Sequence, residues 1–179
     1  MEKDFYGLMD DIHNKMEKGK SYYDLLSDKT KWNQLCASLY TIEDAQSAIS
    51  AYSETDFPED EKGMYLFIYG LLQAFYLQQD AASGLSYSLT GAKINFREDY
   101  PALYKIRSIR DDTIGHPTNR NNRKDCKHAY IQISQISINI FGFDYAIYRD
   151  VNNYEFELQH VNLQECNRFI NTGWHYFYK

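Results

Sequence analysis

The sequence predicts a mainly α-helical protein that carries a small antiparallel β-sheet shortly before its last helix. Two observations predict the helices: apolar residues recur with a period near 3.6 over about 30–53, and a nearly continuous apolar run fills 64–77. A third predicts the sheet, since β-branched and aromatic residues alternate with polar ones over about 129–160. With 179 residues, 44% of them hydrophobic and 25% charged, the chain has the composition of one soluble domain.

The helices can be placed from their periodicity and their ends. Apolar spacing predicts helices over 2–18 and 30–53. The third, 58–89, begins with a proline followed by three acidic residues, and both features favour a helix start. Its centre is apolar on nearly every side, which predicts a buried central helix. Residues 90–98 are expected to form a loop, and Pro101 then begins a further helix.

A polar run, Gln78-Gln79-Asp80, follows the apolar centre of the third helix and admits two interpretations. Either the helix re-emerges into water there, or one of these side chains pairs with Arg107 or Arg110 on the next long helix. The two arginines lie three residues apart, so we expect them on one side of their helix.

The strands are expected to form a three-stranded antiparallel meander, with a hairpin turn at 150–153. The period-2 pattern slips once between Ile133 and Ile136, which a β-bulge would absorb. Asn162 is placed to cap the last helix. One face of such a sheet remains to be covered, either by the bundle or by a partner. The aromatic residues available to it are Tyr145, Tyr148, Tyr154 and Phe156.

Charged residues gather in 106–120, which reads IRSIRDDTIGHPTNR. We expect its helix to stop at Gly115, which can adopt the positive φ that ends helices, and Pro117 disfavours the α conformation at His116. The stop places His116 at a helix end, six residues after Arg110, with Asp111 and Asp112 between them.

The net charge of the chain is -6, yet this part of it is basic. Between Lys105 and Lys127 there are seven basic residues against three acidic ones. A positive zone on an acidic protein fits an anionic ligand such as a phosphate backbone, and a solvated basic loop is the alternative.

Arg110 and His116 offer the groups that metal-free RNA cleavage requires. Imidazole has an unperturbed pKa of roughly 6.5, so His116 can give and take protons near neutral pH. The Arg110 guanidinium matches the oxygens of a phosphate and can stabilise the charge of a phosphorane. Asp111 would fix the His tautomer or the Arg rotamer, or simply pair on the surface.

The segment Arg110-Asp-Asp-Thr-Ile-Gly-His116 resembles the motif of the HEPN superfamily, which is Arg, four to six residues, then His, often with a polar residue beside the Arg. The resemblance covers the helices of about 30–120 and extends to the last helix. It implies one domain over 1–179, an up-and-down helical bundle with its helices within 1–128 and 162–179. The meander, about 129–160, would be an insertion before the last helix.

The resemblance also implies a function: a metal-independent endoribonuclease that works as a homodimer, with two motifs facing each other across a cleft. Relatives act in phage defence or in toxin–antitoxin systems, so an antitoxin is a candidate partner. The implied site residues are Arg110, His116 and Asp111 for catalysis, Arg107, Asn119, Arg120 and Arg123 for binding RNA, and Asp80 and Asp112 in support. The alternative is a catalytically silent module that binds a nucleotide or a protein, in which the motif ties the helix end in place.

The sequence shows no pattern typical of other classes of functional site. His13, His128, His160 and His175 have no metal-binding spacing, and there is no glycine-rich phosphate loop. Three widely spaced cysteines fit reduced thiols in a cytoplasmic protein. The most apolar run is too short to span a bilayer, and the first residues do not form a signal peptide. We therefore expect no cofactor, no metal ion and no membrane.

Overall fold

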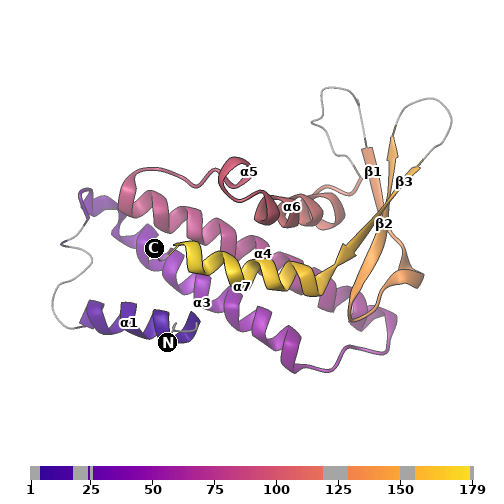
Figure 1. The fold of residues 1–179 in the computed structure, drawn as a ribbon, viewed down its shortest axis with the longest axis horizontal. Helices are drawn as coiled ribbons and strands as arrows, with labels where there is room; N and C mark the ends of the chain where they lie inside the picture. Colours follow the sequence, from indigo (N-terminus) through magenta and orange to yellow (C-terminus); the bar gives the residue numbers. More distant parts are fainter. Residues whose placement is uncertain (1–4, 18–23, 25, 119–128, 150–155, 178–179) are drawn as a thin grey trace.

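The computed structural model describes residues 5–17, 24, 26–118, 129–149 and 156–177. Helices pack side by side into a bundle, and a three-stranded antiparallel sheet lies at one end of it, before the last helix (Figure 1). The predicted fold class is therefore confirmed. In chain order the elements are α1 (Phe5–Glu17), the 3-10 turn η1 (Lys29–Lys31), α3 (Trp32–Glu54), α4 (Glu61–Thr90), α5 (Phe96–Asp99), α6 (Pro101–Arg110), the π turn η2 (Asp111–Gly115), β1 (Ala129–Ile133), the 3-10 turn η3 (Gln135–Ser137), β2 (Gly142–Arg149), β3 (Phe156–Asn162) and α7 (Leu163–Phe177).

The centre of the bundle is the pair α3 and α4. The Asp60 side chain caps α4 by accepting a hydrogen bond from the Gly63 N–H at 2.9 Å. The predicted start at Pro58 was thus three residues early, because the cap that satisfies the free N–H groups lies at Asp60. Gly91 ends α4 with φ of 77°, a left-handed conformation that a residue without Cβ adopts readily.

One hydrophobic core joins α3, α4, α6 and α7 to the inner face of the sheet. Phe75 of α4, Phe143 of β2 and Leu163 of α7 are each 0% exposed. Full burial of such a side chain contributes about 1.5–3 kcal/mol, so these contacts hold the sheet against the bundle. No helix within the described ranges is long and apolar enough to cross a membrane.

The polar run on α4 is buried at its two glutamines and exposed at Asp80. Gln78 and Gln79 are 1% and 3% exposed, and the Gln78 Nε2 donates to Gln46 Oε1 of α3 at 2.8 Å. The interpretation that the helix re-emerges into water at this run is therefore wrong for Gln78 and Gln79 and holds for Asp80. Elsewhere α4 is exposed where burial was predicted: Leu66 and Leu77 are 76% and 40% accessible.

The meander prediction is confirmed, with β2 in the middle and antiparallel to both neighbours. The slip in its pattern is not a bulge. Instead β1 ends at Ile133, and the 3-10 turn η3 takes up the extra residues. Asn162 caps α7 as predicted, since its Oδ1 accepts from the Glu165 N–H at 2.9 Å. The predicted hairpin turn at 150–153 lies outside the described residues.

The connection between α4 and α6 also differs from the expected loop. It contains the short helix α5, whose Phe96 is buried in the core. Pro101 occupies the first turn of α6, as predicted.

Replacing Gly91 tests the left-handed end of α4. A Cβ at this position would meet no atom within 4 Å, so only backbone strain acts there. We expect Gly91→Ala to lower the free energy of unfolding by about 1 kcal/mol in urea titrations. Gly91→Asn should lose less, because asparagine tolerates this conformation. Equal losses in the two variants would show that φ is not the constraint.

Candidate functional site

The stretch that the sequence singled out ends α6 through a π turn. The His116 backbone N–H donates to the Asp111 carbonyl, five residues back, at 2.9 Å. His116 itself has φ of -142° and ψ of 50°, outside the α region, as expected before Pro117. Gly115 does not take the positive φ that we predicted, since of the described glycines Gly91 alone does so. Single π turns of this kind occur frequently at functional sites.

The Arg110 side chain is fixed by groups from two helices. Its Nε and Nη2 both donate to Gln73 Oε1 of α4, at 3.1 and 2.9 Å, and its Nη1 donates to Asp111 Oδ1 at 3.0 Å. The guanidinium carbon also lies 4.3 Å from the centre of the Tyr76 ring, within cation–π range. Three of the five N–H groups of arginine are therefore used.

Gly115 is explained by the position of this guanidinium. A Cβ on Gly115 would lie 2.9 Å from Arg110 Nη1, closer than such atoms approach in proteins. The glycine therefore leaves room for the arginine rather than supplying an unusual backbone angle.

Arg107 lies beside Arg110, as the spacing predicted. Its guanidinium carbon is also 4.3 Å from the centre of the Tyr76 ring, and 5.2 Å from that of Phe96. Asp80 Oδ1 approaches Arg107 Nη2 at 3.7 Å, so the second interpretation of the polar run, pairing between α4 and the arginine helix, describes this contact. With its side chain 19% exposed, Arg107 contributes more to packing than to the surface.

His116 is exposed, unlike the arginines. Within the described part of the chain its imidazole has no hydrogen-bond partner, and its link to Asp111 is through the backbone. The Asp111 carboxylate therefore fixes Arg110 and not the imidazole. Asp112 is buried, at 7% exposed. Three further residues predicted to bind RNA, Asn119, Arg120 and Arg123, lie outside the described residues.

The turn is joined directly to the sheet. The Ile131 N–H of β1 donates to the Pro117 carbonyl at 2.7 Å. The proline that follows the helix end thus also provides a hydrogen-bond acceptor for the strand that follows. The η2 turn, which ends just before His116, and β1 lie in contact where the bundle meets the sheet (Figure 1).

An exposed apolar strip on α4 adjoins the site, and we call it the α4 stripe. It consists of Leu66, Tyr69, Gly70, Gln73 and Leu77, which recur at helical spacing on one side. Gln73, in this strip, is the residue that holds Arg110. A Cβ on Gly70 would meet nothing within 4 Å, so this stretch of α4 has open space in front of it.

Gln73 and Tyr76 are the contributors that sequence reasoning missed. They precede Arg110 by more than 30 residues, and both lie within or beside an apolar run that reads as core. The one available signal was the polar Gln73 inside that run.

Neither a metal site nor a reactive thiol adjoins the turn in the described ranges. No cluster of three or more potential ligands from His, Cys, Asp and Glu is found there. Burial raises the pKa of the Cys166 thiol to about 11, which keeps it protonated near neutral pH.

Comparisons with models of protein families, with curated proteins and with solved structures find no match to this chain.

Replacing Gly115 tests the close approach of the arginine. We expect Gly115→Ala to lower the free energy of unfolding by about 1–3 kcal/mol, because the new methyl group displaces a guanidinium held at three points. In an Arg110→Ala background the same change should cost nothing or stabilise the protein, since the clash is gone and alanine restricts the unfolded chain. Additive effects in this double-mutant cycle, followed by urea unfolding, would contradict the explanation.

Proposed function

We propose that this chain is a HEPN-like endoribonuclease that cleaves RNA without a metal ion and acts as a homodimer. The observation that carries the proposal is the arrangement at the end of α6, where a fixed guanidinium and an exposed imidazole belong to the same helix terminus. Because the segment from Arg110 to His116 resembles the HEPN motif, we propose that the activity serves phage defence or a toxin–antitoxin pair.

The chemistry needs a proton acceptor, a proton donor and positive charge. The ribose 2′-oxygen attacks the adjacent phosphorus, and the bond from phosphorus to the 5′-oxygen breaks, which gives a 2′,3′-cyclic phosphate and a 5′-hydroxyl. His116 would take the proton from the 2′-hydroxyl or give one to the leaving oxygen, a role worth about 10²–10⁴-fold. Arg110 keeps two N–H groups beyond its three bonds, and these can bind the charged phosphorane.

A homodimer would supply the second imidazole, and the α4 stripe offers a surface for it. The stripe is self-complementary when two copies of α4 cross antiparallel about a twofold axis near residues 71–72. Leu66 would then face Leu77 of the other copy, and the exposed Lys62 would face the exposed Asp80. Because Gln73 lies beside that axis and holds Arg110, the pairing would bring the two sites close to each other.

The silent binding module remains the second candidate, and one observation favours it. Arg110 is only 20% exposed and has partners on both sides, which is also what a purely structural tie between α4 and α6 would show. Under this alternative His116 would contact the bound nucleotide or protein and would not transfer a proton. An assay of RNA cleavage distinguishes the two candidates.

Cleavage of an RNA pool in EDTA tests the enzyme. The wild-type protein should cut RNA under these conditions, and His116→Ala should reduce the rate by about 10² or more, because the proton transfer is lost. His160→Ala is a matched control, since His160 is exposed but lies on β3, where it pairs with Asp144. Gel analysis of the products should show cyclic phosphate ends.

Two results would decide against the enzyme. One is a folded wild-type protein that cuts no RNA at any pH between about 5 and 8, the range in which an imidazole changes charge. The other is a His116→Ala variant that cuts at the wild-type rate. Binding of a nucleotide that His116→Ala weakens, together with no cleavage by the wild-type protein, would favour the binding module.

The α4 stripe has its own test. We expect Leu77→Glu to convert a dimer into a monomer in light scattering, because two carboxylates would be buried in an apolar contact. Leu89→Glu is the matched control: it lies on the same helix, has similar exposure (44% against 40%) and falls outside the stripe. A wild-type protein that is monomeric at high concentration, or equal masses for both variants, would overturn this interface.

A further inference from the structure

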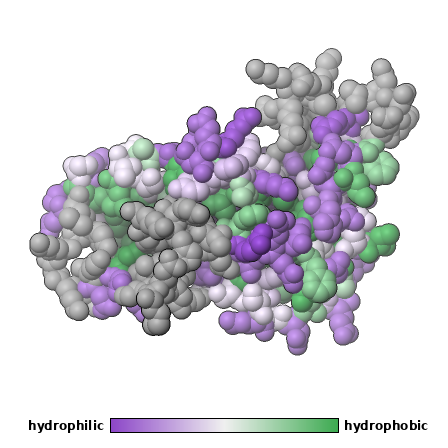
Figure 2. Space-filling view, in the orientation of Figure 1, coloured by the Kyte–Doolittle hydropathy of each residue, from purple (hydrophilic) through white to green (hydrophobic). Residues whose placement is uncertain are grey.

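The outer face of the sheet carries a row of aromatic rings. The strand register places Tyr130 of β1 opposite Tyr148 of β2, and Tyr148 opposite Phe156 of β3. All three rings are on the side away from the core and are 41%, 38% and 58% exposed. The rings of Tyr148 and Phe156 lie 5.6 Å apart between centroids. Figure 2 shows hydrophobic surface at this end of the molecule.

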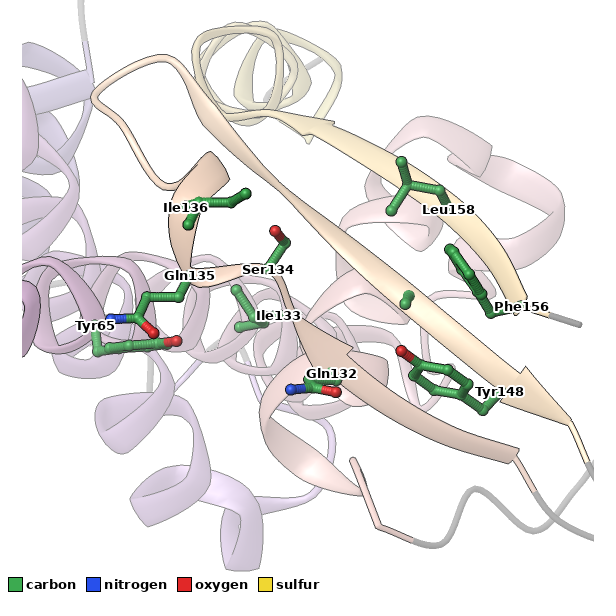
Figure 3. Close-up of a pocket in the computed structure, with 10 residues that line it drawn as sticks. Tyr65, Gln132, Ile133, Ser134, Gln135, Ile136, Tyr148, Phe156 and Leu158 are labelled. Atoms are coloured by element: carbon green, nitrogen blue, oxygen red, sulfur yellow. The ribbon is translucent and has the colours of Figure 1, made fainter. Parts of the chain in front are cut away.

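The next row of the same face is hollow. It consists of Gln132, Ala146 and Leu158, again paired by register, and the small Ala146 lies in the middle. Because alanine fills little space between longer side chains, the face has a pocket of about 390 Å³ at this point. Gln135 and Ile136 of the η3 region are at its far side, together with Tyr65 of α4 (Figure 3).

The two sides of the pocket differ in chemistry. Figure 3 shows Tyr148, Phe156 and Leu158 on one side of the pocket. The other side has the amides of Gln132 and Gln135 and the Ser134 hydroxyl, among the side chains of Tyr65, Ile133 and Ile136. None of the described lining residues carries a charge. The pocket therefore suits a flat, uncharged group that has an apolar face and a hydrogen-bonding edge. An unpaired nucleobase has this combination, and proteins commonly bind single-stranded RNA by stacking its bases on aromatic side chains of a sheet.

We propose that this outer face binds an unpaired nucleobase of single-stranded RNA, with Tyr148 and Phe156 against the base and the Gln132 and Gln135 amides at its edge. Charge supports RNA as the occupant. The residues that lead into β1 in the sequence include four basic ones, Arg120, Arg123, Lys124 and Lys127, against one acidic residue. An uncharged pocket for the base, together with basic residues for the backbone shortly before β1 in the sequence, matches the composition of a nucleotide chain.

The inference adds a substrate class, unpaired RNA, to the proposed function and rests on that function for the choice of RNA. The pocket itself is distinct from the Arg110 and His116 turn. A competing occupant of an apolar sheet face is a protein, including a second copy of this chain, and the test separates these cases.

Binding of a non-cleavable RNA tests the pocket. The probe is a fluorescein-labelled single strand with every 2′-hydroxyl methylated, so that no attacking oxygen is present, and fluorescence anisotropy measures its affinity. We expect the wild-type protein to bind this strand more tightly than its duplex. Phe156→Ala should weaken binding about ten-fold by removing a stacking surface, and Ala146→Leu should do the same by filling the pocket.

Leu89→Ala is the control, because it removes an exposed apolar side chain far along α4 from the sheet. The loss in Phe156→Ala should keep the same ratio at low and high salt, since the pocket is uncharged, whereas overall affinity should fall with salt. Phe156 is largely exposed at the start of β3, so its variant tests the pocket even if Ala146→Leu does not fold.

Several results would overturn the inference. These are wild-type affinity in both sheet variants, equal affinity for strand and duplex, no binding by the folded wild-type protein, or a change of molecular mass in Phe156→Ala that shows a second copy on the sheet. The two proposals fail separately. If Phe156→Ala cleaves and binds RNA like the wild type, the nuclease stands and the pocket is rejected. If binding depends on the pocket but no RNA is cleaved, the pocket stands and the nuclease is rejected.

Discussion

The hydrogen bonds between Arg110 and Gln73 are the interaction on which the rest of the site depends. They connect the end of α6 to the middle of α4 across 37 residues of sequence. Without them the π turn would lose this polar link to the middle of α4, and the Arg110 guanidinium would be held by Asp111 and the Tyr76 ring. Hydrogen bonds to a charged group contribute about 1.5–3 kcal/mol each, which is large for one contact between two helices.

Two like charges share one aromatic ring in this arrangement. Arg107 and Arg110 both lie 4.3 Å from the centre of Tyr76, where their mutual repulsion would oppose folding. Asp80 and Asp111 supply one carboxylate for each arginine, and the ring accepts both guanidinium groups. The cations are thus immobilised, whereas His116 stays exposed. A site built this way combines a rigid positive part with an exposed imidazole.

The local features of the fold could be predicted from the sequence, and the contacts between distant segments could not. The strands, the Asn162 cap and the position of Arg107 and Arg110 on one side of α6 follow from patterns a few residues long. By contrast, Gln73 contacts Arg110 only because α4 and α6 pack together, and no local sequence pattern predicts that contact. Exposure of Leu66 and Leu77 was missed for a related reason: an apolar helix surface has one sequence pattern, whether it faces a core or a partner. The resemblance to HEPN domains remains a prediction.

One helix contributes to both surfaces discussed above. Tyr65 of α4 lines the pocket on the sheet, and Gln73, eight residues later on the same helix, holds Arg110. Eight residues correspond to about 12 Å of helical rise, a length that side-chain motion does not change. A nucleic acid in contact with both places would span a distance that the backbone of α4 fixes. The α4 backbone itself thus sets the spacing between Tyr65, at the far side of the pocket, and Gln73, which holds the Arg110 guanidinium.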